Sequence, residues 1–151
     1  MENPTSSPVR HVPYSRAMAT LLAHITVKPG SEDQFEQIAR TLYERTHAEE
    51  PNVLRYEYWR GADPRTYYTL LSFDDHRSFI EHQVSDHHEA ASPAIGAAVE
   101  SLRLEWVDPL ADASPLPATE MQPAPDGATD LVVAYTDRFA AEVADWWLEQ
   151  R

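Results

Sequence analysis

Four histidines lie close together in the middle of the chain and form its densest group of titratable side chains: His76, His82, His87 and His88. Imidazole is the side chain best suited to accept a proton from a phenol or an enol near neutral pH. His82 and His87 are five residues apart, so they do not share one helix face as ligands four residues apart would. The spacing therefore favours proton transfer over a preformed metal site, and we predict no metal. The structural alternative is that His82 hydrogen-bonds within the core and His87 caps a helix end.

A second group of candidate functional residues is aromatic. It comprises Tyr56, Tyr58, Trp59, Tyr67, Tyr68, Phe73 and Trp106. A cavity lined by some of these rings would suit a flat, apolar ligand. The alternative is that the rings serve only the core and an interface between subunits. The chain has four glycines and no Gly-rich phosphate loop, so we expect no nucleotide cofactor.

Composition excludes several classes of function. The chain contains no cysteine, which rules out disulfides, thiolate nucleophiles and Cys-ligated metals. The formal net charge of −13 argues against nucleic acid and against an anionic membrane surface as partners, because both need clustered Lys and Arg. No apolar run approaches the roughly 18 residues of a membrane span, and the N-terminal residues lack the apolar segment of a signal peptide. A cytoplasmic protein is therefore the expectation.

The strands that must position these side chains are predicted at residues 19–27, 53–61, 66–73 and 101–107. In the first and last of them apolar and polar residues alternate, and the other two are rich in branched and aromatic residues. Two helices separate the strands. The first is predicted to start at a capping Ser31, with a buried face formed by Phe35, Ile38, Ala39, Leu42, Tyr43 and Thr46.

The second helix is predicted to start at a capping Asp74 or Asp75, and a broken helical stretch containing Pro93 and Gly96 follows it. The resulting order is β-α-β-β-α-β. With right-handed crossovers this order closes as an α+β, ferredoxin-like fold, in which a four-stranded antiparallel sheet carries its helices on one face.

The other face of the sheet is also expected to carry large apolar side chains. Tyr58 and Trp59 cannot share a face, and neither can Tyr67 and Tyr68, because successive side chains of a strand alternate. A sheet that is apolar on both faces must cover the second one. A two-fold homodimer packed sheet to sheet is the simplest solution.

The flanking segments are predicted to lie outside this domain, which we place at residues 18–108. Residues 1–17 are interpreted as a flexible arm, and residues 109–128, with five prolines between 109 and 125, as a semi-extended linker. Residues 129–151 are predicted to form a short strand at 131–136 and an amphipathic helix after Asp137. This extension would dock on its own subunit as a lid or on the partner as a swapped clasp.

Residues 19–108 resemble the antibiotic biosynthesis monooxygenase superfamily. The matching features are Lys28-Pro29-Gly30 between the first strand and helix, Glu50-Pro51 just before the second strand, and the pair His82 and His87. The resemblance implies a dimeric α/β barrel with a cavity between sheet and helices in each subunit. Some members oxygenate phenolic polyketides without metal or flavin, some oxidise quinols and some degrade haem.

The residues that carry these activities in the superfamily are only partly present. Thr69, Phe73 and Phe79 stand where the quinone-forming monooxygenases have an Asn, a Trp and a Tyr. Ala23, His82 and Ser92 stand at about the positions of the Asn, Trp and axial His of the haem-degrading members. The axial histidine is therefore missing, and fold-level analogy alone does not choose among the activities.

The sequence leads to one main hypothesis and one alternative. The main hypothesis is a cofactor-independent monooxygenase or quinol oxidase acting on a small aromatic or polyketide-like substrate. His82 and His87 are its predicted catalytic residues, and the predicted substrate-binding residues are Tyr67, Thr69, Phe73 and Phe79. The alternative is a non-catalytic dimeric domain that binds a small apolar ligand.

Overall fold

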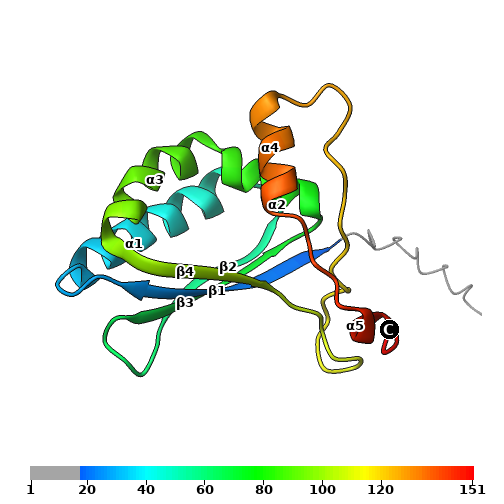
Figure 1. Cartoon of the computed structure of the whole chain (residues 1–151), viewed down its shortest axis with the longest axis horizontal. Coiled ribbons are helices and arrows are strands. Elements are labelled where there is room, and N and C mark those ends of the chain that lie inside the picture. The colour runs from blue at the N-terminus through cyan, green and yellow to red at the C-terminus, as the bar shows by residue number, and fades with distance from the viewer. Residues whose placement is uncertain (1–17) are drawn as a thin grey trace, which may run out of the picture.

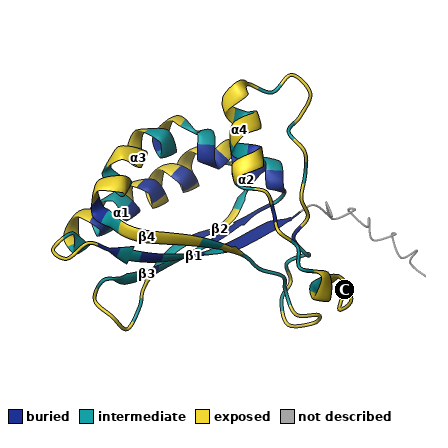
Figure 2. Ribbon diagram, viewed as in Figure 1, coloured by how far each residue is buried: buried dark blue, intermediate teal, exposed yellow. Residues whose placement is uncertain are grey.

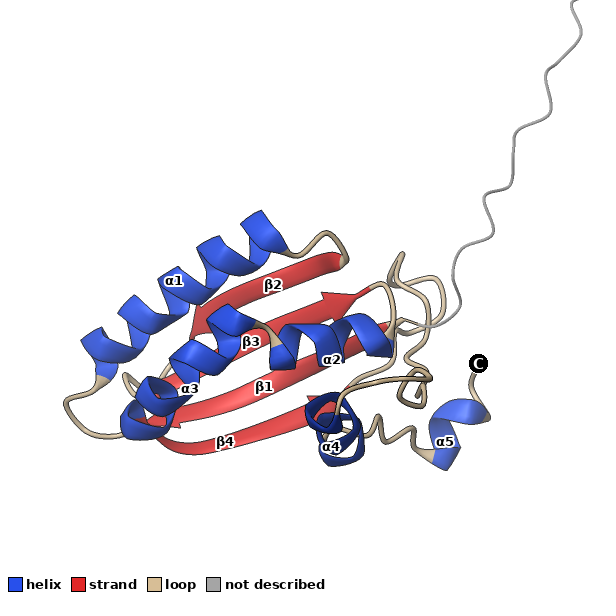
Figure 3. Cartoon of the chain, turned by 90° about the horizontal axis from the view of Figure 1, so that it is seen from above, coloured by secondary structure: helices blue, strands red, loops and turns tan. Residues whose placement is uncertain are grey.

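A computed structural model of the chain describes residues 18–151, and its centre is a four-stranded antiparallel sheet with helices on one face (Figures 1 and 3). The strands are β1 (Ala19–Val27), β2 (Val53–Arg60), β3 (Thr66–Phe73) and β4 (Val99–Trp106). They are ordered β2-β3-β1-β4, so β1 and β3 are central and β2 and β4 are edges. The predicted ferredoxin-like fold is confirmed.

The alternation in β1 decides which side chains face the helices. Leu21, Ala23 and Ile25 are almost fully buried, whereas His24 between them is only half-buried on the opposite face. The pairing of β1 with β3 places Ala23 opposite Thr69, so Thr69 also faces the helices. Figure 2 shows the buried residues concentrated between the sheet and the helices that cover it.

Helix α1 (Glu32–Glu49) runs along this covered face and buries Phe35, Ala39, Leu42 and Thr46 against it. The turn before it uses Gly30 at a φ of 82°, a left-handed conformation that favours glycine. Ser31 occupies the N-cap position, but its side chain makes no capping hydrogen bond. The predicted position of the N-cap residue is therefore right, but the side-chain hydrogen bond expected from it is absent.

The second helical region contains two helices that meet at Ser85. Helix α2 (His76–Val84) starts at Asp75, whose carboxylate accepts a hydrogen bond from the Ser78 amide at 2.7 Å. Helix α3 (Asp86–Ala98) follows, and Pro93 lies inside it without ending it. The break predicted near Pro93 thus lies instead at Ser85, which has an extended backbone and caps the next helix.

The C-terminal extension differs from the prediction. Residues predicted as a short strand form helix α4 (Asp130–Arg138), and the predicted helix after Asp137 is mostly a loop that leads to the short α5 (Asp145–Leu148). Thr129 explains the difference at α4, because its hydroxyl accepts a hydrogen bond from the Val132 amide and so caps a helix. Helix α4 packs against α2 of the same chain (Figure 1).

The proline-rich segment predicted as a linker is tied to the sheet at one point. Thr119 is fully buried, and its hydroxyl accepts from the Thr20 amide and donates to the Val107 carbonyl. Arg151 forms an ion pair with Asp108 at 2.9 Å beside this contact. The predicted flexible arm at residues 1–17 lies outside the described residues. Within residues 18–151, no helix is both long and apolar enough to cross a membrane.

The face of the sheet that carries no helix has a mixed character. Trp59 is 59 % exposed there, and Tyr68 contacts the ring of His24 edge to face. His24 also forms an ion pair with Glu105 at 2.8 Å. Large apolar groups are therefore present on this face as expected, but charged and polar groups lie among them.

Candidate functional site

A cavity of about 220 Å³ lies between the covered face of the sheet and the helices. Its wall includes Ala23, Thr69, Phe79, His82, Tyr135 and Phe139. Much of this wall is apolar, and its polar side chains come from β2, β3, α2, α3 and α4, with Glu89 and Arg138 among them. Such a shape and lining are typical of a site for a small, largely apolar molecule.

His82 is the polar residue of this wall with the clearest chemical arrangement. Its side chain is 1 % exposed, and its Nδ1 atom lies 2.8 and 3.0 Å from the two carboxylate oxygens of Glu50. A carboxylate only accepts hydrogen bonds, so Nδ1 carries the proton. In the neutral ring Nε2 then holds a lone pair. Nε2 is buried and has no hydrogen-bond partner within residues 18–151.

Glu50 lies at the C-terminal end of α1 and binds a second histidine as well. His87 Nε2 is 2.7 Å from the same Glu50 oxygen that His82 contacts, and His87 Nδ1 is 3.4 Å from Glu49. The extended backbone of Ser85 makes this possible, because it turns α3 away from the direction of α2. The spacing argument that kept His82 and His87 apart assumed one continuous helix and is wrong on this point.

His87 does not line the cavity, because both of its ring nitrogens face carboxylates. Its place is behind the pair of Glu50 and His82, where it holds the carboxylate in position. Glu50, His82 and His87 are also the one group of His, Asp and Glu in the described chain whose donor atoms are close enough to hold a metal ion, within 4.8 Å of one another. In the structure these atoms bind each other directly by hydrogen bonds.

Two further residues of the cavity wall carry a buried polar atom that has no protein partner in the described part of the chain, Thr69 at Oγ1 and His88 at Nδ1. Burial, which penalises the charged imidazolium, lowers the pKa of His88 to about 4, and the nearby His82 and His87 add to this effect. His88 is therefore neutral at pH 7. A ligand that carried hydroxyl or carbonyl groups could satisfy all three atoms.

The structure brings together only some of the residues predicted to bind substrate. Thr69 and Phe79 line the cavity. Phe73 is fully buried and lies behind the wall, with its ring centroid 5.3 Å from that of His82. Tyr67 lies farther along β3 and donates a hydrogen bond to Glu36 at 3.1 Å, outside the cavity. Residues 67, 69 and 73 share one face of β3 but lie at different points along the strand, and only Thr69 of the three lies at the level of the cavity.

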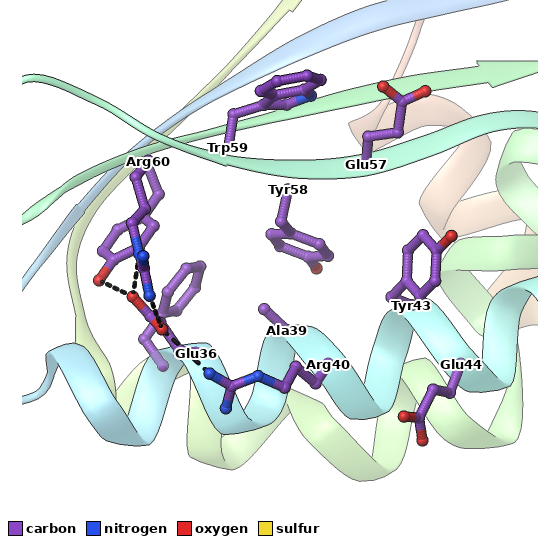
Figure 4. A pocket seen from close by; sticks show the side chains of 11 residues that line it. Glu36, Ala39, Arg40, Tyr43, Glu44, Glu57, Tyr58, Trp59 and Arg60 are labelled. Atoms are coloured by element: carbon purple, nitrogen blue, oxygen red, sulfur yellow. Dashed lines mark hydrogen bonds and ion pairs between the residues drawn. The ribbon is translucent and has the colours of Figure 1, made fainter.

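A second hollow, the outer groove, lies on the surface between α1 and β2 and has a volume of about 750 Å³ (Figure 4). Glu36 accepts hydrogen bonds there from Arg60 at 2.7 Å and from Arg40 at 3.2 Å. These bonds, above all those from Arg60, lower the pKa of the Glu36 carboxyl to about 2. Tyr58 projects from β2 into the groove.

Sequence reasoning missed several residues of the site. Glu50 was noted only as part of a Glu-Pro motif, although its carboxylate organises both histidines. His88 was not among the predicted site residues, and residues 131–136 were predicted as a strand, so Tyr135 and Phe139 were not predicted to line the cavity. The Glu-Pro motif was the one sequence signal that pointed toward Glu50.

Three solved structures illustrate what the chain is similar to. A candidate antibiotic biosynthesis monooxygenase from Caulobacter crescentus is 24% identical, with 64% of this chain and 92% of that chain covered and a TM-score of 0.59. Another from Bacteroides thetaiotaomicron is 18% identical, with 72% and 99% covered and a TM-score of 0.62. A protein from Mycobacterium tuberculosis is 16% identical, with 65% and 100% covered and a TM-score of 0.59. At these identities the likeness shows the fold.

The family follows from the sequence itself. No curated protein sequence matches the chain significantly. A sequence model of the family described as antibiotic biosynthesis monooxygenase matches residues 18–94, about half of the chain. This range contains β1 to β3, α1, α2 and the three residues Glu50, His82 and His87. The chain belongs to the antibiotic biosynthesis monooxygenase family.

Proposed function

We propose that the protein is a cofactor-independent oxygenase or quinol oxidase that acts on a small aromatic molecule in the inner cavity. The observation that carries the proposal is the free Nε2 atom of His82. This atom is buried and belongs to a residue of the cavity wall, and the other nitrogen of its ring is held by the Glu50 carboxylate. A base and an orienting carboxylate are elements of general base catalysis.

In the proposed reaction His82 Nε2 accepts the proton of a phenol or an enol. The negative charge of Glu50 stabilises the imidazolium that forms, as a buried carboxylate does in other carboxylate–histidine pairs. The electron-rich anion then reduces O₂. A quinol and O₂ give a quinone and H₂O₂. In a substrate with a ring CH₂ group that can enolise, CH₂ and O₂ give C=O and water. Both equations balance with O₂ as the sole oxidant and need no other cofactor.

The remaining polar atoms of the cavity are assigned to binding. Thr69 Oγ1 and His88 Nδ1 would hydrogen-bond to oxygen substituents of the ring, and Phe79 would pack against its face. Tyr56 and Tyr58 share a hydrogen bond of 2.8 Å between their hydroxyls. Burial raises the pKa of Tyr58 to about 12, so these phenols stay neutral and do not compete with His82 as bases.

The assembly belongs to the same proposal. A homodimer formed through the open face of the sheet would cover the exposed Trp59 and the half-buried Tyr68. The four-part division of the chain, with residues 18–108 as the family domain and the following residues as an extension of it, is likewise proposed.

Oxygen uptake with simple hydroquinones and with anthrone tests the function. We expect consumption of O₂ by the parent protein and a loss of at least about 100-fold in His82→Ala, the usual contribution of a general base. His47→Gln is the matched control, because His47 is exposed on α1 and outside the cavity. Equal rates in the parent and in His82→Ala would refute the base.

Absent uptake with every substrate would favour the non-catalytic binding domain instead. The replacement of the family's polar handles by Thr69, Phe73 and Phe79 is the observation that favours this alternative. Addition of hemin provides a further check, since a Soret shift lost in His82→Ala would favour haem chemistry.

A further inference from the structure

The inner cavity and the outer groove share a wall. Phe35 and Tyr58 line both hollows, so these two rings lie between the solvent-facing groove of about 750 Å³ and the cavity of about 220 Å³. Their ring centroids are 6.0 Å apart and the rings meet edge to face. Within residues 18–151, no other residue lines both spaces. The pair is therefore the boundary that the two hollows share.

Tyr58 is the less buried half of the wall. It lies on β2, which is an edge strand with a hydrogen-bonded neighbour on one side only, whereas Phe35 is 3 % exposed and faces the core from α1. Within residues 18–151 the Tyr58 hydroxyl makes one hydrogen bond, to the hydroxyl of Tyr56 at 2.8 Å. Figure 4 shows the ring directed into the groove toward α1. Rotation of this one side chain would join the two hollows.

The charges of the groove select among aromatic ligands. Three carboxylates line it, from Glu36, Glu44 and Glu57, against the two guanidinium groups of Arg40 and Arg60. Both of these arginines form ion pairs with Glu36 (Figure 4). An anionic ligand would therefore meet a net negative groove whose arginines are already paired, whereas the apolar lining suits a neutral ring.

We infer that the outer groove is the route by which a neutral, flat aromatic molecule reaches the inner cavity, and that Tyr58 is the gate between them. The inference rests on the proposed function for the identity of the occupant. The gate itself can be tested without the reaction, because it controls the rates of binding and release whether or not catalysis follows.

Stopped-flow fluorescence with 2-naphthol, a neutral two-ring phenol that fluoresces, tests the route. Glu44 is exposed and forms part of the groove but not of the cavity, so Glu44→Trp obstructs the groove without entering the core. We expect association and dissociation both to slow about fivefold or more, with an equilibrium affinity within about twofold of the parent, because only the barrier changes. Ala48→Trp, an exposed position on the same helix, is the matched control.

Two variants of Tyr58 test the gate. Tyr58→Phe loses only the hydrogen bond to Tyr56 and is expected to raise both rates about fivefold, the equivalent of one neutral hydrogen bond. Tyr58→Ala is expected to raise them further. The anion 2-naphthalenesulfonate, used with the parent protein, should bind at least about tenfold more weakly than 2-naphthol.

Several outcomes would overturn the inference. If Glu44→Trp bound and released 2-naphthol as fast as Ala48→Trp, the route would lie elsewhere, for example under α4. Equal rates in Tyr58→Phe and the parent would exclude the gate, and failure of the parent to bind 2-naphthol would exclude the ligand class. Binding kinetics as expected without oxygen uptake would reject the proposed chemistry and keep the route.

Discussion

Replacing Glu50 by glutamine would keep the shape of the side chain and remove its charge. One carboxylate oxygen lies 2.8 Å from His82 Nδ1 and 2.7 Å from His87 Nε2, and the amide oxygen of a glutamine could occupy the same place. The two hydrogen bonds would remain, but neither would be assisted by a negative charge. The variant therefore separates the electrostatic role of Glu50 from its geometric one.

The magnitude follows from these two contacts. A hydrogen bond to a charged group contributes about 1 kcal/mol more than a neutral one, so two such bonds amount to about 2 kcal/mol. The carboxylate is 15% exposed, and relief of its desolvation returns part of this energy. We expect Glu50→Gln to lose about 1–2 kcal/mol of unfolding free energy, which lowers Tm by roughly 3–8 °C for a chain of this size.

Urea unfolding and the ¹⁵N shifts of the His82 ring are the measurements. The parent should show the proton on Nδ1 of His82. Glu50→Gln should show a mixture of tautomers, because Nδ1 lies near both carboxylate oxygens and one of them becomes an NH₂ donor. Glu49→Gln is the matched control for stability, because Glu49 is 46% exposed and forms its ion pairs, with Arg45 and His87, at the surface. If Glu50→Gln matched Glu49→Gln in stability and kept the parent tautomer, the role assigned to the Glu50 charge would be refuted.

Three further predictions concern stability and assembly. The lowered pKa of Glu36, about 2 against an ordinary 4.5, stabilises the fold above about pH 4.5, and this contribution is lost as the pH falls toward 2. The partner Arg60 is 75% exposed, so solvent screening reduces the contribution to about 1–2 kcal/mol of unfolding free energy. Urea unfolding should show this difference between Glu36→Gln and the parent at pH 7 and a smaller difference at pH 3. Thr119→Val should lose about 1–3 kcal/mol, since it leaves the buried Thr20 amide without its acceptor; an unchanged urea midpoint would show that the contact is not structural. Light scattering should find a dimer for the parent at micromolar concentration and more monomer for Trp59→Lys, and a monomeric parent would contradict packing through the open face.

The sheet could be predicted because its signals are local. Alternation along residues 19–27 placed Leu21, Ala23 and Ile25 on the covered face, and this face is the buried one. The capping Asp75 and the turn at Gly30 likewise depend on only a few adjacent residues. Such features need no knowledge of distant contacts, so the order and faces of the elements followed from the sequence.

The site could be predicted only in part because it depends on distant contacts. His82 was identified by its residue type, but its partner Glu50 is 32 residues away, at the end of another helix. The convergence of His87 on the same carboxylate depends on the extended backbone of one serine. The segment 131–136 is too short and too evenly apolar to distinguish strand from helix by periodicity, and the cap at Thr129 decided the outcome.

The position of α4 in the cavity wall has a consequence for the divergence of the protein. Tyr135 and Phe139 lie beyond residue 94, where the family match ends, whereas Glu50, His82 and His87 lie within it. One wall of the cavity can therefore vary through substitutions in the C-terminal segment while the histidine–carboxylate cluster stays intact. Exchange of this segment between homologues offers a way to change the range of molecules accommodated and to leave the base untouched.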